Sequence, residues 1–183
     1  MTKKLYQIQI ALKEIKPKIW RRLLVPSNML LSDFHSVIQA VMGWYDFHLH
    51  QFVQGETYYT VKMADDDYWD EMGSVDYKKM KISDLLSFEK EKINYVYDFG
   101  DYWQHQITLE KILPFDVKGK YPVCVAGKMN CPPEDCGGAS GYMDLLNILQ
   151  QPEHEEYQGM LDWLGGSFDP AYFNLDEVNQ RLS

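Results

Sequence analysis

The sequence lacks any uninterrupted apolar run long enough to cross a membrane, which takes about 18 residues or more. In the first twenty positions Gln and Lys interrupt the apolar residues, whereas an export signal needs a continuous apolar stretch. Only three cysteines occur, and reduced thiols are the ordinary state in a cytoplasmic protein. We therefore expect a cytoplasmic protein with no membrane partner. Its 183 residues can bury a core without disulfides, and we expect a single domain over 1–183.

Positive charge is also scarce, because 18 Lys and Arg face 27 Asp and Glu, which leaves a net charge of −9. Proteins that bind nucleic acid normally carry a basic face that neutralises phosphates. Basic residues gather here only at 3–4, at 21–22 and between 78 and 92. The charge balance therefore argues against a nucleic-acid partner. The absence of a glycine-rich phosphate motif and of regular strand–helix alternation argues against a doubly wound sheet.

Apolar residues that alternate at period two predict several strands. Four such segments are found, over 5–12, 19–25, 93–97 and 103–109. A hairpin over 48–54 and 57–62 is predicted in addition, because Gly55-Glu56 suits a two-residue turn of type II′. Two stretches have no predicted regular structure. They are the acidic segment Asp65 to Glu71, a predicted loop, and the proline- and glycine-rich segment 114–141, whose length is typical of a functional or flexible loop.

Helical spacing of apolar residues predicts one helix between the strands and others after them. The first has Ser32 as its predicted N-cap and ends at Gly43, a favourable residue just beyond a helix. Three more are predicted in the last third of the chain, over 142–149, from Pro152 to 164, and from the cap Asn174 onward. The sequence therefore predicts an α+β fold, with a mainly antiparallel sheet, one inserted helix and a helical C-terminal part.

Six motifs in order carry a resemblance to a known family. They are Pro17-x-Ile19-Trp20-Arg21-Arg22, Met42-Gly43-Trp44 with His48-Leu49-His50-x-Phe52, Tyr97-Asp98-Phe99-Gly100-Asp101-x-Trp103-x-His105, Cys131-Pro132-Pro133-Glu134-Asp135-x-Gly137-Gly138, Gly141-Tyr142, and Trp163-Leu164-Gly165-Gly166-x-Phe168-Asp169-Pro170. Together they resemble the plasmid pRiA4b ORF-3-like family, from about residue 5 to the end of the chain. The resemblance implies an α+β fold and an association with mobile elements, since some members are called transposon passenger proteins. It implies no particular reaction, substrate or catalytic residue.

Three histidines form the first candidate site. His48 and His50 lie two apart on a predicted strand and should share a face, and His105 lies on another predicted strand. Imidazoles from neighbouring strands could bind zinc or another divalent ion, with Asp98 and Asp101 as further ligands or as partners that orient a ring. The alternative is that the histidines are structural and hydrogen-bonded among aromatic side chains.

Three cysteines form a second candidate zinc site. Cys124, Cys131 and Cys136 have the spacing C-x6-C-x4-C. One pair has a spacing known from zinc knuckles, and the fourth ligand would have to come from elsewhere. The same prolines and glycines suit any tight loop, so an ordinary loop is the alternative.

The rigid turn Pro132-Pro133-Glu134-Asp135 presents two carboxylates. With Asp98 and Asp101 these could complete the carboxylate–histidine site of a hydrolase. The alternative is a salt bridge to Arg21 or Arg22. These two arginines are adjacent and face opposite sides of a strand, so a carboxylate partner is expected for the one on the face of Ile19 and Leu23.

Three functional hypotheses follow. The first is a non-enzymatic binding or adaptor domain for a protein or a small-molecule ligand. The others are a metal-dependent hydrolase and an accessory protein of a DNA element. We expect the polar motif residues to meet in space and to line a cleft. The candidate residues for it are Arg21, Arg22, Trp44, His48, His50, Asp98, Asp101, Trp103, His105, Glu134 and Asp135.

Overall fold

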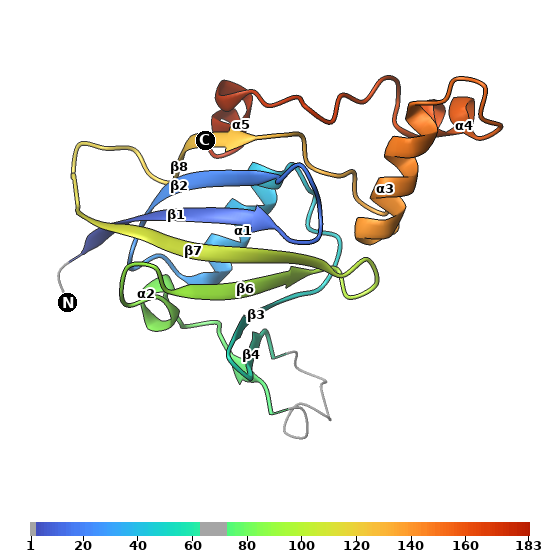
Figure 1. Cartoon of the computed structure of the whole chain (residues 1–183). Coiled ribbons are helices and arrows are strands. Elements are labelled where there is room, and N and C mark those ends of the chain that lie inside the picture. The colour runs from blue at the N-terminus through green and yellow to red at the C-terminus, as the bar shows by residue number, and fades with distance from the viewer. Residues whose placement is uncertain (1–2, 63–72) are drawn as a thin grey trace.

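A computed structural model describes residues 3–62 and 73–183, and its centre is one eight-stranded sheet (Figure 1). The strands are β1 (Lys4–Leu12), β2 (Trp20–Pro26), β3 (His50–Gln54), β4 (Thr57–Thr60), β5 (Val75–Asp76), β6 (Lys92–Tyr97), β7 (Trp103–Pro114) and β8 (Val123–Lys128). Their order is β5-β4-β3-β6-β7-β1-β2-β8, and every pair is antiparallel except β4 with β5. The predicted α+β class with a mainly antiparallel sheet is confirmed.

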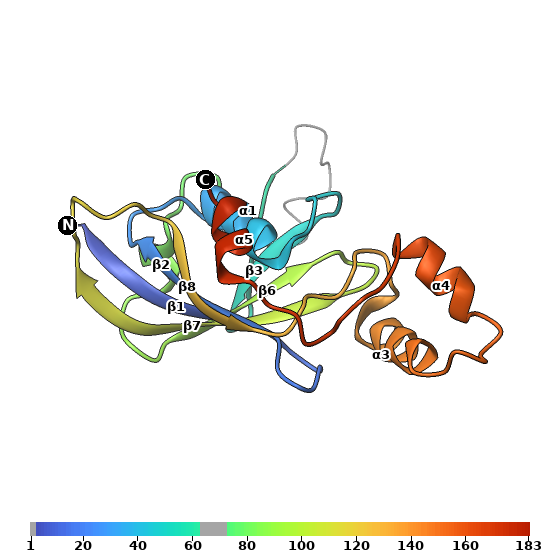
Figure 2. The same ribbon diagram turned by 90° about the horizontal axis from the view of Figure 1, so that it is seen from above.

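Five helices accompany the sheet in the part of the chain that the structure describes. They are α1 (Leu31–Met42), α2 (Ile82–Leu85), α3 (Gly138–Leu149), α4 (Tyr157–Trp163) and α5 (Leu175–Gln180). Figure 2 shows α1 and α5 on the same face of the sheet, while α3 and α4 lie together beyond its end. No helix among residues 3–62 and 73–183 is long and apolar enough to cross a membrane.

The helix-bearing face of the sheet forms the core. Alternate residues of the central strands point to it and are fully buried, among them Ile8, Ile10, Leu23, Ile107 and Leu109. The predicted apolar stripe of α1 packs on them through Phe34, Ile38 and Val41. The period-two pattern exists because successive strand residues point to opposite faces, so one face is apolar and the other polar.

Several of the predicted boundaries need correction. α1 begins one residue before Ser32, and its N-cap Leu30 offers no side-chain bond, so the predicted Ser32 cap is wrong. Gly43 does end this helix, with a positive φ of 83° that glycine adopts without a steric cost. Pro152 does not start a helix, because α4 begins at Tyr157. Asn174 is confirmed as a cap, since its side chain accepts the N–H groups of the first turn of α5.

The stretch 114–141 contains an element that the sequence pattern did not predict. β8 forms within it and pairs with β2 at the edge of the sheet. Its glycine and alternating small residues give a weak periodicity, so pairing with a neighbouring strand decides its structure. The predicted hairpin around Gly55 is present as β3 and β4. The predicted loop from Asp65 to Glu71 lies outside the described residues.

Arg21 is buried on the core face. The carboxylate partner predicted for it is wrong, because Arg21 forms no ion pair with any described carboxylate. Its Nε donates to the carbonyl of Val41 at 3.1 Å, and one terminal nitrogen donates to the carbonyl of Lys128 at 3.0 Å. The other terminal nitrogen donates to Cys131 Sγ at 3.1 Å. The Val41 carbonyl lies in the last turn of α1, where the helix dipole is negative, so this environment stabilises a cation without a carboxylate.

Arg22 makes the carboxylate pair instead. It points to the opposite, polar face of the sheet and forms two bonds to Glu110, at 2.6 and 2.8 Å. The same carboxylate accepts from Gln7 at 2.8 Å. The pair therefore fastens β2 to β7 across β1, on the face that carries no helix.

These adjacent arginines give a matched comparison. We expect Arg21→Lys to lower the free energy of unfolding by about 2–3 kcal/mol, because an ammonium group cannot reach three separate acceptors and leaves buried carbonyls unpaired. Arg22→Lys should cost less than about 1 kcal/mol, because its pair is partly solvated. Urea denaturation at neutral pH measures both values. Equal losses for the two variants would contradict this account of Arg21.

Candidate functional site

Three chain segments meet at one end of the sheet and hold several polar residues of the motifs. They are residues 43–49 after α1, residues 98–102 between β6 and β7, and residues 129–137 between β8 and α3 (Figure 1). Trp44 joins the first to the third, because its indole N–H donates to the carbonyl of Pro132 at 2.9 Å. The elements that precede these segments are rigid, so the loop side chains have defined positions.

Glu134 links parts of the chain at this end of the sheet through hydrogen bonds. Its carboxylate accepts the Tyr97 hydroxyl at 2.5 Å and the backbone N–H of Tyr45 at 2.9 Å. Burial and the adjacent Glu134 carboxylate both raise the pKa of Tyr97, which therefore stays a hydrogen-bond donor. With both oxygens occupied in this way, Glu134 has a positioning role.

Asp101 and Gly138 hold the second and third segments together. Asp101 accepts the backbone N–H of Gly137 at 3.1 Å. Gly138 has a φ of 68° and lies against the backbone of Asp101, where a Cβ atom would collide with the carbonyl oxygen. The glycine pair of this motif is therefore required by close packing of two backbones.

His48, Asp98 and Asp135 converge where the three segments meet. His48 Nε2 lies 3.0 Å from Asp135 Oδ1 and 3.7 Å from Asp98 Oδ2. The three ligand atoms all lie within 4.8 Å of one another. One imidazole and two carboxylates are a suitable set of donors for a divalent metal ion.

His50 belongs to a different cluster under α1. Its ring stacks on His35 at a centroid distance of 3.4 Å, and its Nε2 is hydrogen-bonded to the Tyr77 hydroxyl. His35 is bonded through Nδ1 to Tyr95 and through Nε2 to Asp46, both at 2.8 Å. Burial lowers the pKa of both rings, to about 3 for His50. Every ring nitrogen named here already has a protein partner, so this cluster has the character of a structural network.

His105 and Trp103 lie deeper still. His105 is completely buried beside Trp44 and Tyr95, and its Nδ1 donates to the Trp103 carbonyl at 3.0 Å. Its Nε2 has no hydrogen-bond partner among the described residues, and burial lowers its pKa to about 4. The fold thus separates His48, His50 and His105, and their ligand atoms do not meet as one described metal group.

The three cysteines are separated too. Cys131 is buried against Arg21, and Cys124 donates to the carbonyl of Ala126 at 3.4 Å. Within the described residues the three sulfur atoms do not form one group of possible ligands. Burial raises the pKa of all three thiols, to about 12 for Cys136, which favours the protonated form.

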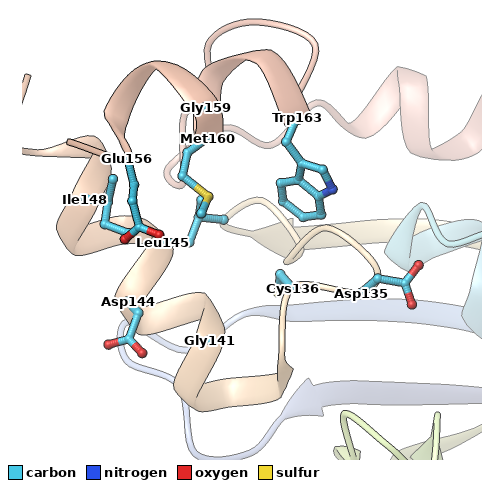
Figure 3. Close-up of a pocket in the computed structure, with 10 residues that line it drawn as sticks. All are labelled: Asp135, Cys136, Gly141, Asp144, Leu145, Ile148, Glu156, Gly159, Met160 and Trp163. Carbon is cyan, nitrogen blue, oxygen red and sulfur yellow. The ribbon is translucent and has the colours of Figure 1, made fainter. Parts of the chain in front are cut away.

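Two cavities lie next to Asp135. Both Asp135 and Trp163 line each of them. One, of about 550 Å³, lies between the 43–47 and 130–135 segments and includes Tyr45 and Phe47, each 75% exposed. The other, of about 510 Å³, lies between α3 and α4, and Figure 3 shows its lining. Tyr45, Phe47 and Trp163 were not among the predicted cleft residues, although each lies next to or within one of the six motifs.

The charge around these cavities is strongly asymmetric. Residues 129–183 contain ten of the 27 acidic residues and only one of the 18 basic residues, Arg181. Residues 1–128 contain 17 of each kind, so the entire net charge of −9 arises from the C-terminal part. The sequence contains this signal, but the total charge of the chain hides it.

Comparison with known proteins identifies relatives over nearly the whole chain. The family model described as plasmid pRiA4b ORF-3-like protein matches residues 4–177. The uncharacterized protein y4hQ of Sinorhizobium fredii (strain NBRC 101917 / NGR234) is 32% identical over 184 residues, which cover all of this chain and 92% of y4hQ. The crystal structure of MM3350 from Methanosarcina mazei Go1, a protein of unknown function, is 41% identical, with a TM-score of 0.87, and covers 97% of this chain and 99% of that one.

The buried His105 gives a prediction on pH. A histidine in the unfolded chain titrates near pH 6.5, and its folded-state pKa is lower, about 4. Its contribution to stability is therefore complete above pH 6.5 and is lost as the pH falls from there toward 4, by about 2–4 kcal/mol in all. We expect His105→Gln to flatten the dependence of the unfolding free energy on pH in this window, measured by urea denaturation.

His154→Gln, on the loop between α3 and α4, is the control and should keep the wild-type slope. The same slope in His105→Gln as in the wild type would contradict the prediction.

Proposed function

We propose that this chain, which belongs to the plasmid pRiA4b ORF-3-like family, is a non-enzymatic binding domain for a basic segment of a partner protein. The binding site is the cavity between α3 and α4, and it takes the side chain of a lysine or an arginine. The observation that carries the proposal is the restriction of the whole net negative charge to the part of the chain that forms this cavity.

The walls of the cavity suit the side chain of a basic residue. Figure 3 shows Met160 and Trp163 of α4 directed toward the cavity, with Glu156 and Asp144 on the side away from Trp163. An aromatic face attracts a cation through its ring quadrupole, and apolar side chains pack on the methylene groups that precede the charge. No Lys or Arg of the described residues forms an ion pair with Asp144 or Glu156. These carboxylates are therefore available to a partner.

The weak attachment of α4 supports a role as a binding surface. None of its residues is buried, and Trp163 is 49% exposed. A half-exposed tryptophan beside a cavity gains contact area when a partner covers it, and tryptophan is enriched among residues that dominate binding energy. Long-range attraction between the acidic end and a basic segment would also speed their association.

The other two hypotheses have less support. A hydrolase that uses His48, His50 and His105 together requires ligand atoms that the fold keeps apart. An accessory role in direct contact with DNA requires a basic surface, and the end of the molecule that holds the motif segments is acidic. If the family's association with mobile elements applies to this chain, a protein partner would fit its charge better than a phosphate backbone.

A peptide titration tests the proposal. The probe is a fluorescein-labelled peptide of alternating arginine and glycine, and its anisotropy is followed while the full chain is added. We expect saturable binding that weakens as salt is added, because the attraction is electrostatic. Trp163→Ala should weaken it at least fivefold, consistent with a cation–π contact of about 1–2 kcal/mol. The double variant Asp144→Asn, Glu156→Gln should weaken it similarly and reduce its salt dependence.

The controls separate the cavity from the general charge of the chain. Glu56→Gln removes an exposed carboxylate at the tip of the β3–β4 turn and should leave the affinity unchanged. A labelled peptide of alternating glutamate and glycine and a labelled DNA duplex should not bind. Unchanged affinity in Trp163→Ala, or tighter binding of the duplex than of the basic peptide, would show that the proposal is wrong.

A further inference from the structure

A second site lies on the other side of Asp135, and it does not depend on the proposed binding of a basic segment. We infer that His48, Asp98 and Asp135 bind a single divalent transition-metal ion. The three side chains come from three separate segments that meet at the end of the sheet. This set differs from the His48, His50 and His105 set that the sequence predicts, because only His48 is common to both.

The spacing of the ligand atoms matches that of a coordination sphere. Two atoms that are each about 2.1 Å from one tetrahedral ion lie about 3.4 Å from each other. The observed separations from His48 Nε2 are 3.0 Å to Asp135 and 3.7 Å to Asp98, one on each side of that value. A small adjustment of the exposed Asp135 side chain would therefore complete the geometry.

Asp98 gives an electrostatic reason for a cation here. Asp98 is only 8% exposed, and its Oδ1 accepts the backbone N–H of Gly100 at 2.8 Å. Its other oxygen faces His48, and none of the described Lys or Arg residues forms an ion pair with Asp98. A buried carboxylate is unfavourable unless it is paired with positive charge, and a metal ion provides such a partner.

His48 offers an uncommitted nitrogen. Its Nε2 is shielded from solvent and forms no hydrogen bond of acceptable geometry with the described residues, although Asp135 is near. By contrast, both ring nitrogens of His35 are hydrogen-bonded, to Tyr95 and to Asp46, and Nε2 of His50 is hydrogen-bonded to Tyr77. Of the two histidine–carboxylate groups, the one at His48 is therefore the one with a free ligand atom.

The backbone holds these ligands in advance of any ion. The backbone N–H of Asp98 donates to the Leu49 carbonyl at 2.8 Å, which fixes Asp98 beside the segment that carries His48. Glu134, next to Asp135, is held by Tyr97 and by the backbone of Tyr45. Ligands that are already in place lose little conformational entropy on binding, and this raises the affinity for the ion.

The donor set indicates the class of metal and the access to it. One nitrogen and two carboxylates suit Zn²⁺, Co²⁺ or Mn²⁺, whereas Ca²⁺ prefers six or more oxygen ligands and Mg²⁺ keeps most of its waters. Three protein ligands leave a fourth position for water or for a ligand atom. Asp135 also lines the 550 Å³ cavity, so that position would be reached from the cleft that contains Tyr45 and Phe47.

Isothermal titration of the full chain with ZnCl₂, after dialysis against a chelator and then chelator-free buffer, tests the inference. We expect about one equivalent to bind with micromolar affinity or better. His48→Ala and Asp135→Asn should each weaken it at least tenfold, whereas His154→Ala should not change it. Co²⁺ should give visible absorption bands of a low-symmetry, four- or five-coordinate site, and His48→Ala should lose these bands. The basic peptide is omitted, so the result is independent of the proposed function.

Two further measurements keep the test decisive. Asp135 is exposed, so Asp135→Asn should fold normally, and circular dichroism of each variant confirms that lost binding is not lost folding. Stoichiometric binding that survives in both His48→Ala and Asp135→Asn would overturn the inference. Binding that is lost in His50→Gln but kept in His48→Ala would place the ion at the other histidine cluster and would overturn it as well. So would the absence of binding at 100-fold molar excess of ZnCl₂.

Discussion

The buried guanidinium of Arg21 is the interaction on which the arrangement of the site segments depends. It binds the carbonyl at the end of α1 and the carbonyl at the end of β8, and its third contact is Cys131 in the segment that follows β8. Its flat face also packs on Phe173, 4.7 Å from the ring centre, which ties the C-terminal region to the same point. One cation thus fixes where the 43–49 and 129–137 segments leave the rigid part of the fold.

The end of the molecule beyond Arg21 is built by polar contacts between loops. Glu134 and Asp101 each bind a backbone N–H of a neighbouring segment, and Gly138 permits two backbones to touch. Several acidic residues of the motifs therefore have structural roles. Asp98 and Asp135 are different, because each directs an oxygen toward His48. The same short motifs supply both the frame and the proposed metal ligands, which explains why motif membership alone does not identify function.

The fold divides the candidate histidines according to their surroundings. His35, His50 and His105 lie among buried aromatic rings, and burial lowers the pKa of each, so the neutral form is the stable one. His48 lies beside two carboxylates, and one of them, Asp135, lines an open cavity. The two proposals concern opposite sides of Asp135, one a pocket for a cationic side chain and the other a site for a metal ion. The similarity to MM3350 indicates that this architecture is present in a solved relative.

Local patterns in the sequence were enough to predict the strands around Ile8, Leu23, Tyr95 and Ile107, because period-two alternation follows directly from the geometry of a strand. They also predicted the end of α1 at Gly43 and the cap at Asn174, since both depend on nearby residues only. The weak strand β8 and the partner of Arg21 were decided by tertiary contacts. So was the division of His48 from His50: the period-two pattern predicts that they share a strand face, but β3 begins at His50 and His48 lies in the segment before it. That division requires knowing which side chains α1 and the loop after β8 bring to each ring, and these come from residues far apart in the chain.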